Sequence, residues 1–355
     1  MSATVLDTLI ELTSLPGPTG QEELVLAWCR DRWSQLGAEV EVQPVGNVLA
    51  RIPGNGPKLM IQGHADEIGF MVKSIDDRGF VWLATAQVGP RIPHDRYPVG
   101  QPALVLGRDG AQVPGLFATV TGHILVTRAE KHTLEANDLF VDLGVETKEE
   151  AEALGVYVGA NVIWNPPVRR IGKRYVSKAI DDRIALALVT HLIADIDRTA
   201  LAYDLTIAAT VQEEIGLIGA TSLTRGGYDL AIAIDNGPLG DYPGVDPREM
   251  PIKLGHGPTL VYKDGSAHYD RRIIKRLLDV ATVNQIPVQE SVVQGMGTDG
   301  AAMIRSGVPT AMMMMATRYT HSPLEMGDER DLEAALALLK AFVTTPASPL
   351  PLGPS

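Results

Sequence analysis

Five short groups of histidine and carboxylate residues stand where predicted strands end or a predicted helix begins. In chain order they are His64-Ala65-Asp66, Asp181-Asp182, Glu213-Glu214, Asp235 and His321. Ligands of α/β proteins bind at the carboxyl ends of the sheet strands, so these groups are expected to converge on one sheet edge. Each group alone has an ordinary explanation, such as a helix cap, a turn or a solvated pair. Together they would bury several like charges, which is costly without a compensating cation.

The ligand types indicate which cation would fit. Two histidines and three carboxylates form a mixed nitrogen and oxygen set, which suits zinc, cobalt or manganese better than calcium. The number of ligands suits two metal ions that share one bridging carboxylate. Such a pair can hold a water molecule and lower its pKa toward about 7, which is the chemistry of metal-assisted hydrolysis.

The segments that carry these groups predict an α/β fold. Helical patterns alternate with short apolar strands near both ends of the chain, which indicates a sheet with helices on both faces. Strands are expected over 58–63, 203–211, 230–234 and 310–316, and helices over 3–14, 182–196, 215–224 and 332–344. Thr19 and Glu22 have the spacing of a capping box for a helix over 22–36. A hairpin is expected over 39–52.

The middle of the chain has a different pattern of predicted secondary structure. From about residue 69 to 167, strand-like pieces alternate with Gly and Pro turns, which predicts a small β-barrel or sandwich inserted into the α/β chain. One short acidic helix is expected there, over 147–154. The last ten residues, 346–355, are rich in Pro and Ser and are predicted to form a flexible tail.

Composition and charge exclude several classes of protein. The 355 residues carry a formal net charge of −12 and no Lys/Arg stripe, which argues against nucleic-acid binding. No stretch approaches the roughly 18 apolar residues of a membrane span, and the N-terminus lacks the basic segment of a signal peptide. Cys29 is the single cysteine, so no intramolecular disulfide can form. These features favour the cytoplasm.

The motifs in their order resemble one peptidase family. The segments GHADEIG, AIDDR, QEEIG, AID, GTDG and RYTHSPLEM are similar to those of the M42 metallo-aminopeptidases, also called tetrahedral or TET aminopeptidases. The resemblance covers nearly the whole chain, and LFVDLGVETKEEAEALGVYVG resembles that family's inserted dimerisation domain. It implies a catalytic domain of the co-catalytic zinc peptidase type over 1–68 and 168–345, and a dimerisation domain over 69–167. It also implies dimers that build a twelve-subunit tetrahedral shell, although some members remain dimers.

The resemblance assigns metal ligands position by position. His64 and Asp235 would hold one divalent ion, Glu214 and His321 would hold the other, and Asp181 would bridge the two. Zn²⁺ or Co²⁺ is expected, and Mn²⁺ also suits the ligand set. The peptide bond between Asp181 and Asp182 is expected to be cis.

Four further residues receive roles from the same resemblance. Glu213 would be the general base that takes a proton from the metal-bound water. Adjacent residues at an extended strand end point in opposite directions, so Glu214 could bind metal while Glu213 faces the substrate. Asp66 would accept a hydrogen bond from the second ring nitrogen of His64 and fix its tautomer. Asp299 and His123 are candidate substrate-binding residues. The implied reaction releases N-terminal amino acids from short peptides.

Other readings of the same residues remain open. A carboxypeptidase or deacylase of the wider co-catalytic metallohydrolase group would use a related site. A glucanase could pair Glu213 with another carboxylate as acid and base, although 5% aromatic residues leave little for sugar stacking. A noncatalytic scaffold would not need Glu213 together with every metal ligand. A neutral aliphatic residue such as Leu is expected at the substrate N-terminus, with acidic residues as the alternative.

Overall fold

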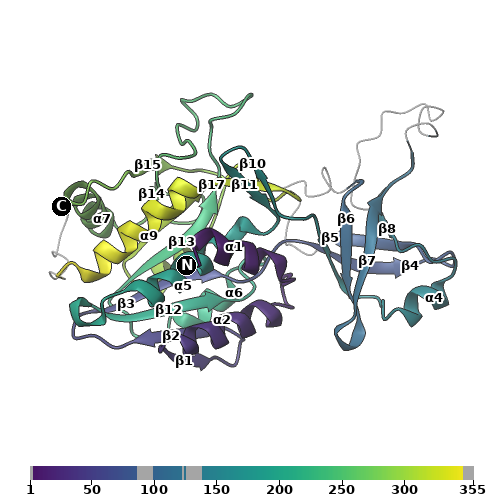
Figure 1. Cartoon of the computed structure of the whole chain (residues 1–355), viewed down its shortest axis with the longest axis horizontal. Coiled ribbons are helices and arrows are strands. Elements are labelled where there is room, and N and C mark those ends of the chain that lie inside the picture. Colours follow the sequence, from purple (N-terminus) through teal and green to yellow (C-terminus); the bar gives the residue numbers. More distant parts are fainter. Residues whose placement is uncertain (1–2, 86–98, 122–123, 125–137, 347–355) are drawn as a thin grey trace.

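The computed structural model describes residues 3–85, 99–121, 124 and 138–346 (Figure 1). A layered α/β body occupies one side of the molecule and a β-barrel stands beside it, joined through the chain segments before β4 and after β9. The predicted fold class is therefore confirmed. Within the described residues, no helix has the length and apolar character needed to cross a membrane.

An eight-stranded sheet forms the centre of the α/β body, in the order β1-β2-β12-β3-β13-β16-β14-β15. Its strands are β1 (Glu39–Val42), β2 (Val48–Ile52), β3 (Lys58–His64), β12 (Asp204–Thr210), β13 (Leu230–Gly237), β14 (Thr259–Lys263), β15 (Gln289–Val292) and β16 (Thr310–Ala316). β12, β3, β13 and β16 are mutually parallel, with Thr210 paired to His64 and Asp235 paired to Met314. Their carboxyl ends consequently meet at one edge, as the sequence predicts.

Helices cover both faces of this sheet. The larger apolar layer packs against α1 (Val5–Ser14), α2 (Glu23–Gln35), α5 (Ile180–Asp195), α7 (Arg271–Val283) and α9 (Glu329–Thr344), and the smaller one against α6 (Ile218–Leu223) and α8 (Gly300–Arg305). Successive strand side chains point to opposite faces, so Ile61 lies in the larger layer and Met60 in the smaller.

The middle of the chain forms a closed barrel in the order β4-β5-β8-β7-β6-β9. Its elements are β4 (Phe70–Ile75), β5 (Val81–Thr85), β6 (Pro102–Leu106), β7 (Gln112–Ala118), β8 (Phe140–Asp142) and β9 (Asn161–Trp164), with the short helix α4 (Lys148–Ala153). Phe70, Phe117 and Trp164 fill the interior, and the Phe70 ring centroid lies 5.3 Å from that of Phe117 and 5.6 Å from that of Trp164. The barrel therefore has an apolar core of its own.

A small antiparallel sheet that the sequence did not predict leads the chain from the barrel back to the site. It contains β10 (Arg169–Ile171), β11 (Arg174–Ser177) and β17 (Glu325–Asp328), in the order β10-β11-β17. Ser177 pairs with Glu325. Because α5 begins three residues after Ser177 and β17 begins four residues after His321, this pairing places the start of α5 close to His321.

The first turn of α5 departs from a regular helix. The Asp181–Asp182 peptide is cis, as expected, and both residues have non-helical backbone angles. A Cβ at Gly63 would collide with the side chain of Ala185 and lie 2.8 Å from Asp182 Oδ2. Glycine at position 63 thus lets α5 approach β3 closely.

The predicted capping box of Thr19 and Glu22 is wrong. Glu22 is the N-cap residue of α2, but no side chain caps the helix. The Thr19 hydroxyl instead donates to Asp66 Oδ2 at 2.9 Å, and Glu22 Oε1 accepts from the N–H of Gln212 at 3.1 Å. Both side chains have tertiary partners near the glutamate pair, and Glu22 Oε1 also accepts the N–H of Gly20 at 2.8 Å instead of that of Thr19. The helix expected over 215–224 is also shorter, because a turn precedes Ile218.

Candidate metal centre

The five expected metal ligands come together at the carboxyl edge of the sheet. His64 ends β3, Asp235 lies in β13, Asp181 is in the first turn of α5, and Glu214 and His321 follow β12 and β16. Asp181 Oδ1 lies 3.1 Å from His64 Nε2, and Asp181 Oδ2 lies 3.1 Å from His321 Nε2. The two oxygens of one carboxylate therefore face the two imidazoles.

The remaining carboxylates divide between these two histidines. Asp235 Oδ1 lies 3.9 Å from His64 Nε2, and Glu214 Oε1 lies 3.4 Å from His321 Nε2. In each of the sets His64–Asp181–Asp235 and Asp181–Glu214–His321, the candidate ligand atoms lie within 4.8 Å of one another. A cavity of about 460 Å³ opens onto both sets.

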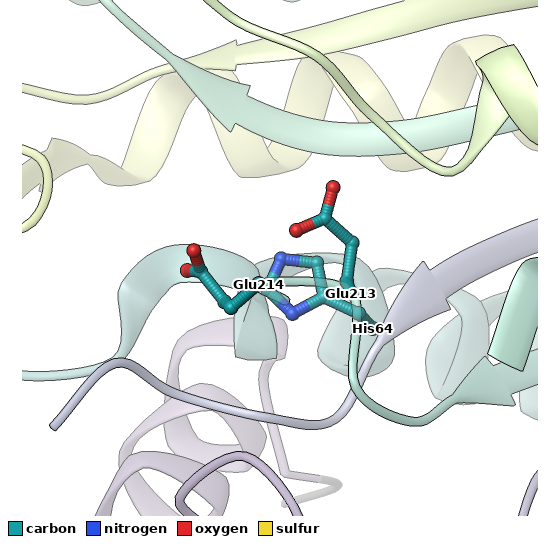
Figure 2. Close-up of side chains that lie close together, drawn as sticks. All are labelled: His64, Glu213 and Glu214. Atoms are coloured by element: carbon teal, nitrogen blue, oxygen red, sulfur yellow. The ribbon is translucent and has the colours of Figure 1, made fainter. Parts of the chain in front are cut away.

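The adjacent glutamates do not extend a strand. β12 ends at Thr210, and Gln212 has a left-handed backbone (φ 53°), so Glu213 and Glu214 sit in a turn. The expected alternation along an extended strand end is therefore wrong. Figure 2 shows the two carboxylates directed to different places around the His64 ring. Glu213 and Glu214 also form a third compact set with His64, so Glu213 lies within reach of the same centre.

Burial and mutual repulsion dominate the electrostatics. Burial raises the pKa of Glu214 to about 7, with Asp181 adding repulsion against the opposing pull of His321. Burial likewise raises the pKa values of Glu213 and Asp235, and neighbouring carboxylates add to both shifts. The pKa of Asp181 is lowered instead, because hydrogen bonds from His321 and His64 outweigh its own burial.

The same contacts raise the pKa values of both histidines. Burial alone would lower them, but hydrogen bonds to Asp181 and Asp66 raise that of His64. Glu214 and Asp181 raise the pKa of His321 to about 10. The cluster thus attracts positive charge.

Comparison with known proteins identifies the family. A sequence model described as M42 glutamyl aminopeptidase matches residues 46–338. The chain belongs to the M42 peptidase family. It is 30% identical over 353 residues to the glutamyl aminopeptidase of Lactococcus lactis, covering 96% of each chain.

Solved structures give the same result. An aminopeptidase from the archaeon Desulfurococcus kamchatkensis matches with a TM-score of 0.90 at 31% identity, covering 97% of this chain and 95% of that one. The TET1 peptidase of Pyrococcus horikoshii matches with a TM-score of 0.85 at 27% identity, covering 96% and 99%. The protein is accordingly an aminopeptidase, and its family depends on divalent metal.

The M42 centre of this chain fits divalent ions chemically. Its donors are imidazole nitrogens and carboxylate oxygens, a set that suits zinc and other first-row ions. Buried carboxylates with raised pKa values are unfavourable as anions on their own, and a dication removes that penalty. The residues present therefore agree with the metal dependence of the family.

Asp66 holds the glutamate turn and His64 in place. Its carboxylate accepts the N–H groups of Glu213 and Glu214 at 2.9 and 3.2 Å. His64 Nδ1 donates to the backbone carbonyl of Asp66 at 3.1 Å and lies 3.4 Å from its Oδ1. This arrangement leaves Nε2 of His64 facing Asp181 and Asp235.

Glu325 is a supporting residue that the sequence reasoning missed. It is 2% exposed, its Oε2 accepts the N–H of Asp181 at 3.0 Å, and its Oε1 accepts the N–H of His321 at 2.9 Å. Burial raises its pKa to about 8. The available signal was the carboxylate four residues after His321 in the motif RYTHSPLEM.

The two candidate substrate-binding residues have different outcomes. Asp299 is buried behind the site and accepts a hydrogen bond from the Thr210 hydroxyl at 2.5 Å. Burial raises its pKa to about 6. Asp299 is not among the described residues that line the cavity. From the same segment of the chain, the residues that line it are Gly295, Met296 and Gly297. His123 lies outside the described residues.

The contacts of Glu325 predict a loss of metal affinity in Glu325→Gln. Glutamine keeps the shape but replaces one acceptor with an N–H₂ group, so one of the two backbone amides loses its partner. We expect metal affinity to fall about 10–100-fold, the range seen when partners of metal ligands are removed. Competition with a chromogenic chelator measures this affinity. Glu333→Gln, an exposed carboxylate on α9, is the matched control, and equal affinities in the two variants would contradict the role of Glu325.

Proposed function

We propose that this protein is a dinuclear metallo-aminopeptidase that releases N-terminal residues from short peptides. His64 and Asp235 hold one divalent ion, Glu214 and His321 hold the other, and Asp181 bridges them. The observation that carries this proposal is the position of Asp181, whose two carboxylate oxygens each lie 3.1 Å from a different histidine. Zinc or cobalt suits this set best, and manganese also fits.

Glu213 is the general base in this proposal. When bound, the two ions lower the pKa of a water molecule and polarise a peptide carbonyl. The Glu213 carboxylate accepts the proton of that water and later gives it to the leaving amine. Support comes from its place on the cavity wall, its raised pKa and the Asp66 bond that fixes its backbone. Glu214 Oε1, in contrast, faces His321.

The cavity also suits the N-terminus of a peptide. Its carboxylates attract a protonated α-amino group, which a blocked or internal residue lacks. Leu217, Pro238 and Met296 contribute apolar wall, and none of the described lining residues is Lys or Arg. We therefore infer a preference for a neutral aliphatic first residue.

We infer that the barrel formed by β4–β9, within the expected domain 69–167, mediates dimerisation and that dimers assemble further. The P. horikoshii TET1 peptidase can assemble into a tetrahedron or a large octahedral shell. On the barrel of this chain, Met71, Leu116 and Val158 are 37%, 48% and 64% exposed, which is apolar surface that a partner would cover. We also infer a cytoplasmic location, because Cys29 is single and buried.

The function is tested by peptide hydrolysis with controlled metal content. The protein should release Leu from leucinamide and from Leu-Ala-Gly, faster than it releases Glu or Lys from the matching amides. N-acetylated peptides and cellulosic substrates should not react. Chelation should abolish hydrolysis, and two equivalents of zinc or cobalt should restore it. Cleavage of N-acetylated peptides at an equal rate would favour the deacylase or carboxypeptidase alternative.

A matched pair of variants separates the base from the ligand. Glu213→Gln keeps the side-chain shape but cannot accept a proton, so kcat should fall about 10²–10⁴-fold while two ions remain bound. Glu214→Gln should instead lose bound metal, because a neutral amide is a poorer ligand. Metal analysis by mass spectrometry beside steady-state kinetics distinguishes the two. A Glu213→Gln protein with normal kcat and full metal would place the base elsewhere.

The assembly inference is tested by light scattering on the purified protein. The expected particle has the mass of twelve subunits, and dilution should yield dimers before monomers. Replacing Leu116 and Val158 with Asp should shift the population toward monomer, because charge on a covered apolar surface opposes association. The same replacements at Val283 and Val292, exposed positions on the α/β body, serve as the control. An unchanged mass in the barrel variant would exclude the barrel as the primary contact.

A further inference from the structure

A second cavity of about 430 Å³ lies directly beside the metal-centre cavity. Pro238 and Thr320 line both, so the two spaces share a wall. Tyr242, Tyr319 and Leu324 complete much of the second cavity on the α/β side, and Gln101 reaches it from the barrel. The catalytic edge and the barrel thus meet at this point.

The loop after β16 shapes this cavity. Tyr319 and His321 both have left-handed backbones (φ 62° and 58°), a conformation that costs free energy for residues other than glycine and persists only where the surroundings fix it. Two contacts hold the start of this loop: Arg318 Nε donates to Asp241 at 2.7 Å, and the Arg318 backbone pairs with Met326. His321 consequently faces the metal centre while its neighbours line the second cavity.

The barrel wall is fixed as well. The backbone carbonyl of Gln101 accepts the N–H of Phe117 at 3.0 Å, and Phe117 belongs to the barrel core. Across the cavity the Tyr242 and Tyr319 rings lie 5.7 Å apart. Both walls are therefore held by contacts within the protein.

None of the described residues that line the cavity is charged. Its described residues are Gln, Pro, Tyr, Thr, Ser and Leu, and the adjacent charges of Arg318 and Asp241 bond to each other. A charged side chain that entered would lose hydration without gaining a partner, whereas an apolar or hydroxyl side chain would not. The ligand chemistry that fits is a neutral amino-acid side chain.

Covalent geometry indicates which substrate residue this is. The scissile carbonyl belongs to the first residue of the peptide, so the Cα of that residue is one bond from the reacting carbon and its side chain stays in the metal-centre cavity. The next Cα lies 3.8 Å further along the chain. We propose that the second cavity binds the side chain of the second residue of the peptide and selects a neutral one, with Gln101 of the barrel as a specificity-determining residue. This inference rests on the proposed aminopeptidase function.

The test places a charge at Gln101. Leu-Lys-Gly and Leu-Glu-Gly differ only in the second residue, and leucinamide has no second side chain. In the full-length wild type both charged peptides should react more slowly than Leu-Leu-Gly. Gln101→Glu should raise the ratio of kcat/KM for Leu-Lys-Gly over Leu-Glu-Gly by about fivefold, and Gln101→Lys should lower it by about fivefold, the effect of one solvent-accessible ion pair.

The control variant is Gln112→Glu, which adds the same charge at the exposed opposite end of β7. It should leave the ratio at its wild-type value. Equal ratios in the Gln101 and Gln112 variants would overturn the proposal, and so would a shift confined to the ratio of lysinamide to glutamic acid amide, which would assign the cavity to the first residue. If the wild type hydrolyses neither leucinamide nor the peptides, the proposed function itself fails. Leucinamide turnover by each variant shows that it is folded.

Discussion

Five carboxylates, those of Asp66, Asp181, Glu213, Glu214 and Asp235, are held together with little solvent at the carboxyl edge of the central sheet. Their mutual repulsion and lost hydration raise the pKa values of Glu213 and Asp235 and bring that of Glu214 to about 7. Two imidazolium groups cannot balance that many anions. Divalent ions can, because they supply charge at short range in a poorly solvated place. The burial of these carboxylates at one sheet edge therefore gives a physical reason for the metal dependence of the family.

Further buried acids hold the backbone of the proposed ligand residues in place. Asp66 accepts the N–H groups of the glutamate turn, and Glu325 accepts those of Asp181 and His321. Asp182 Oδ2 accepts the N–H of His64 at 3.1 Å. Each bond fixes a loop or strand end at or next to a residue that is proposed to bind metal. A metal centre needs its ligands held within a fraction of an ångström, and these carboxylates provide that restraint on segments that are not regular strands.

The sequence predicted the parts of the site that follow from strand direction. Four parallel strands bring His64, Glu214, Asp235 and His321 to one edge whatever the details of their loops. Glu325 could not be found this way, because its role depends on β17 pairing with β11, a contact between distant segments. The capping box predicted for Thr19 and Glu22 was wrong for a similar reason. The two residues match a local capping pattern, but the Thr19 hydroxyl bonds to the distant Asp66, and Glu22 accepts the N–H groups of Gly20 and the distant Gln212. Gln101 acquires a place beside the site only through the position of the barrel.

One buried ion cluster connects the chain segment that carries His64 to the segment that carries Asp181. Lys178 Nζ lies 2.8 Å from both oxygens of Glu67, and Arg183 lies 3.5 Å from Glu67 while donating to the carbonyl of Leu12. Removing such charges from water is costly, so the cluster is weak evidence for stability, but its geometry is specific. Glu67 follows the His64–Asp66 segment, whereas Lys178 and Arg183 flank Asp181. Because Gly17 also donates to Glu67 at 3.1 Å, the same cluster fastens the chain after α1 onto the site. This cluster thus links the segment that carries His64 to the segment that carries Asp181, and its three charged residues are not among the described residues that line the cavity.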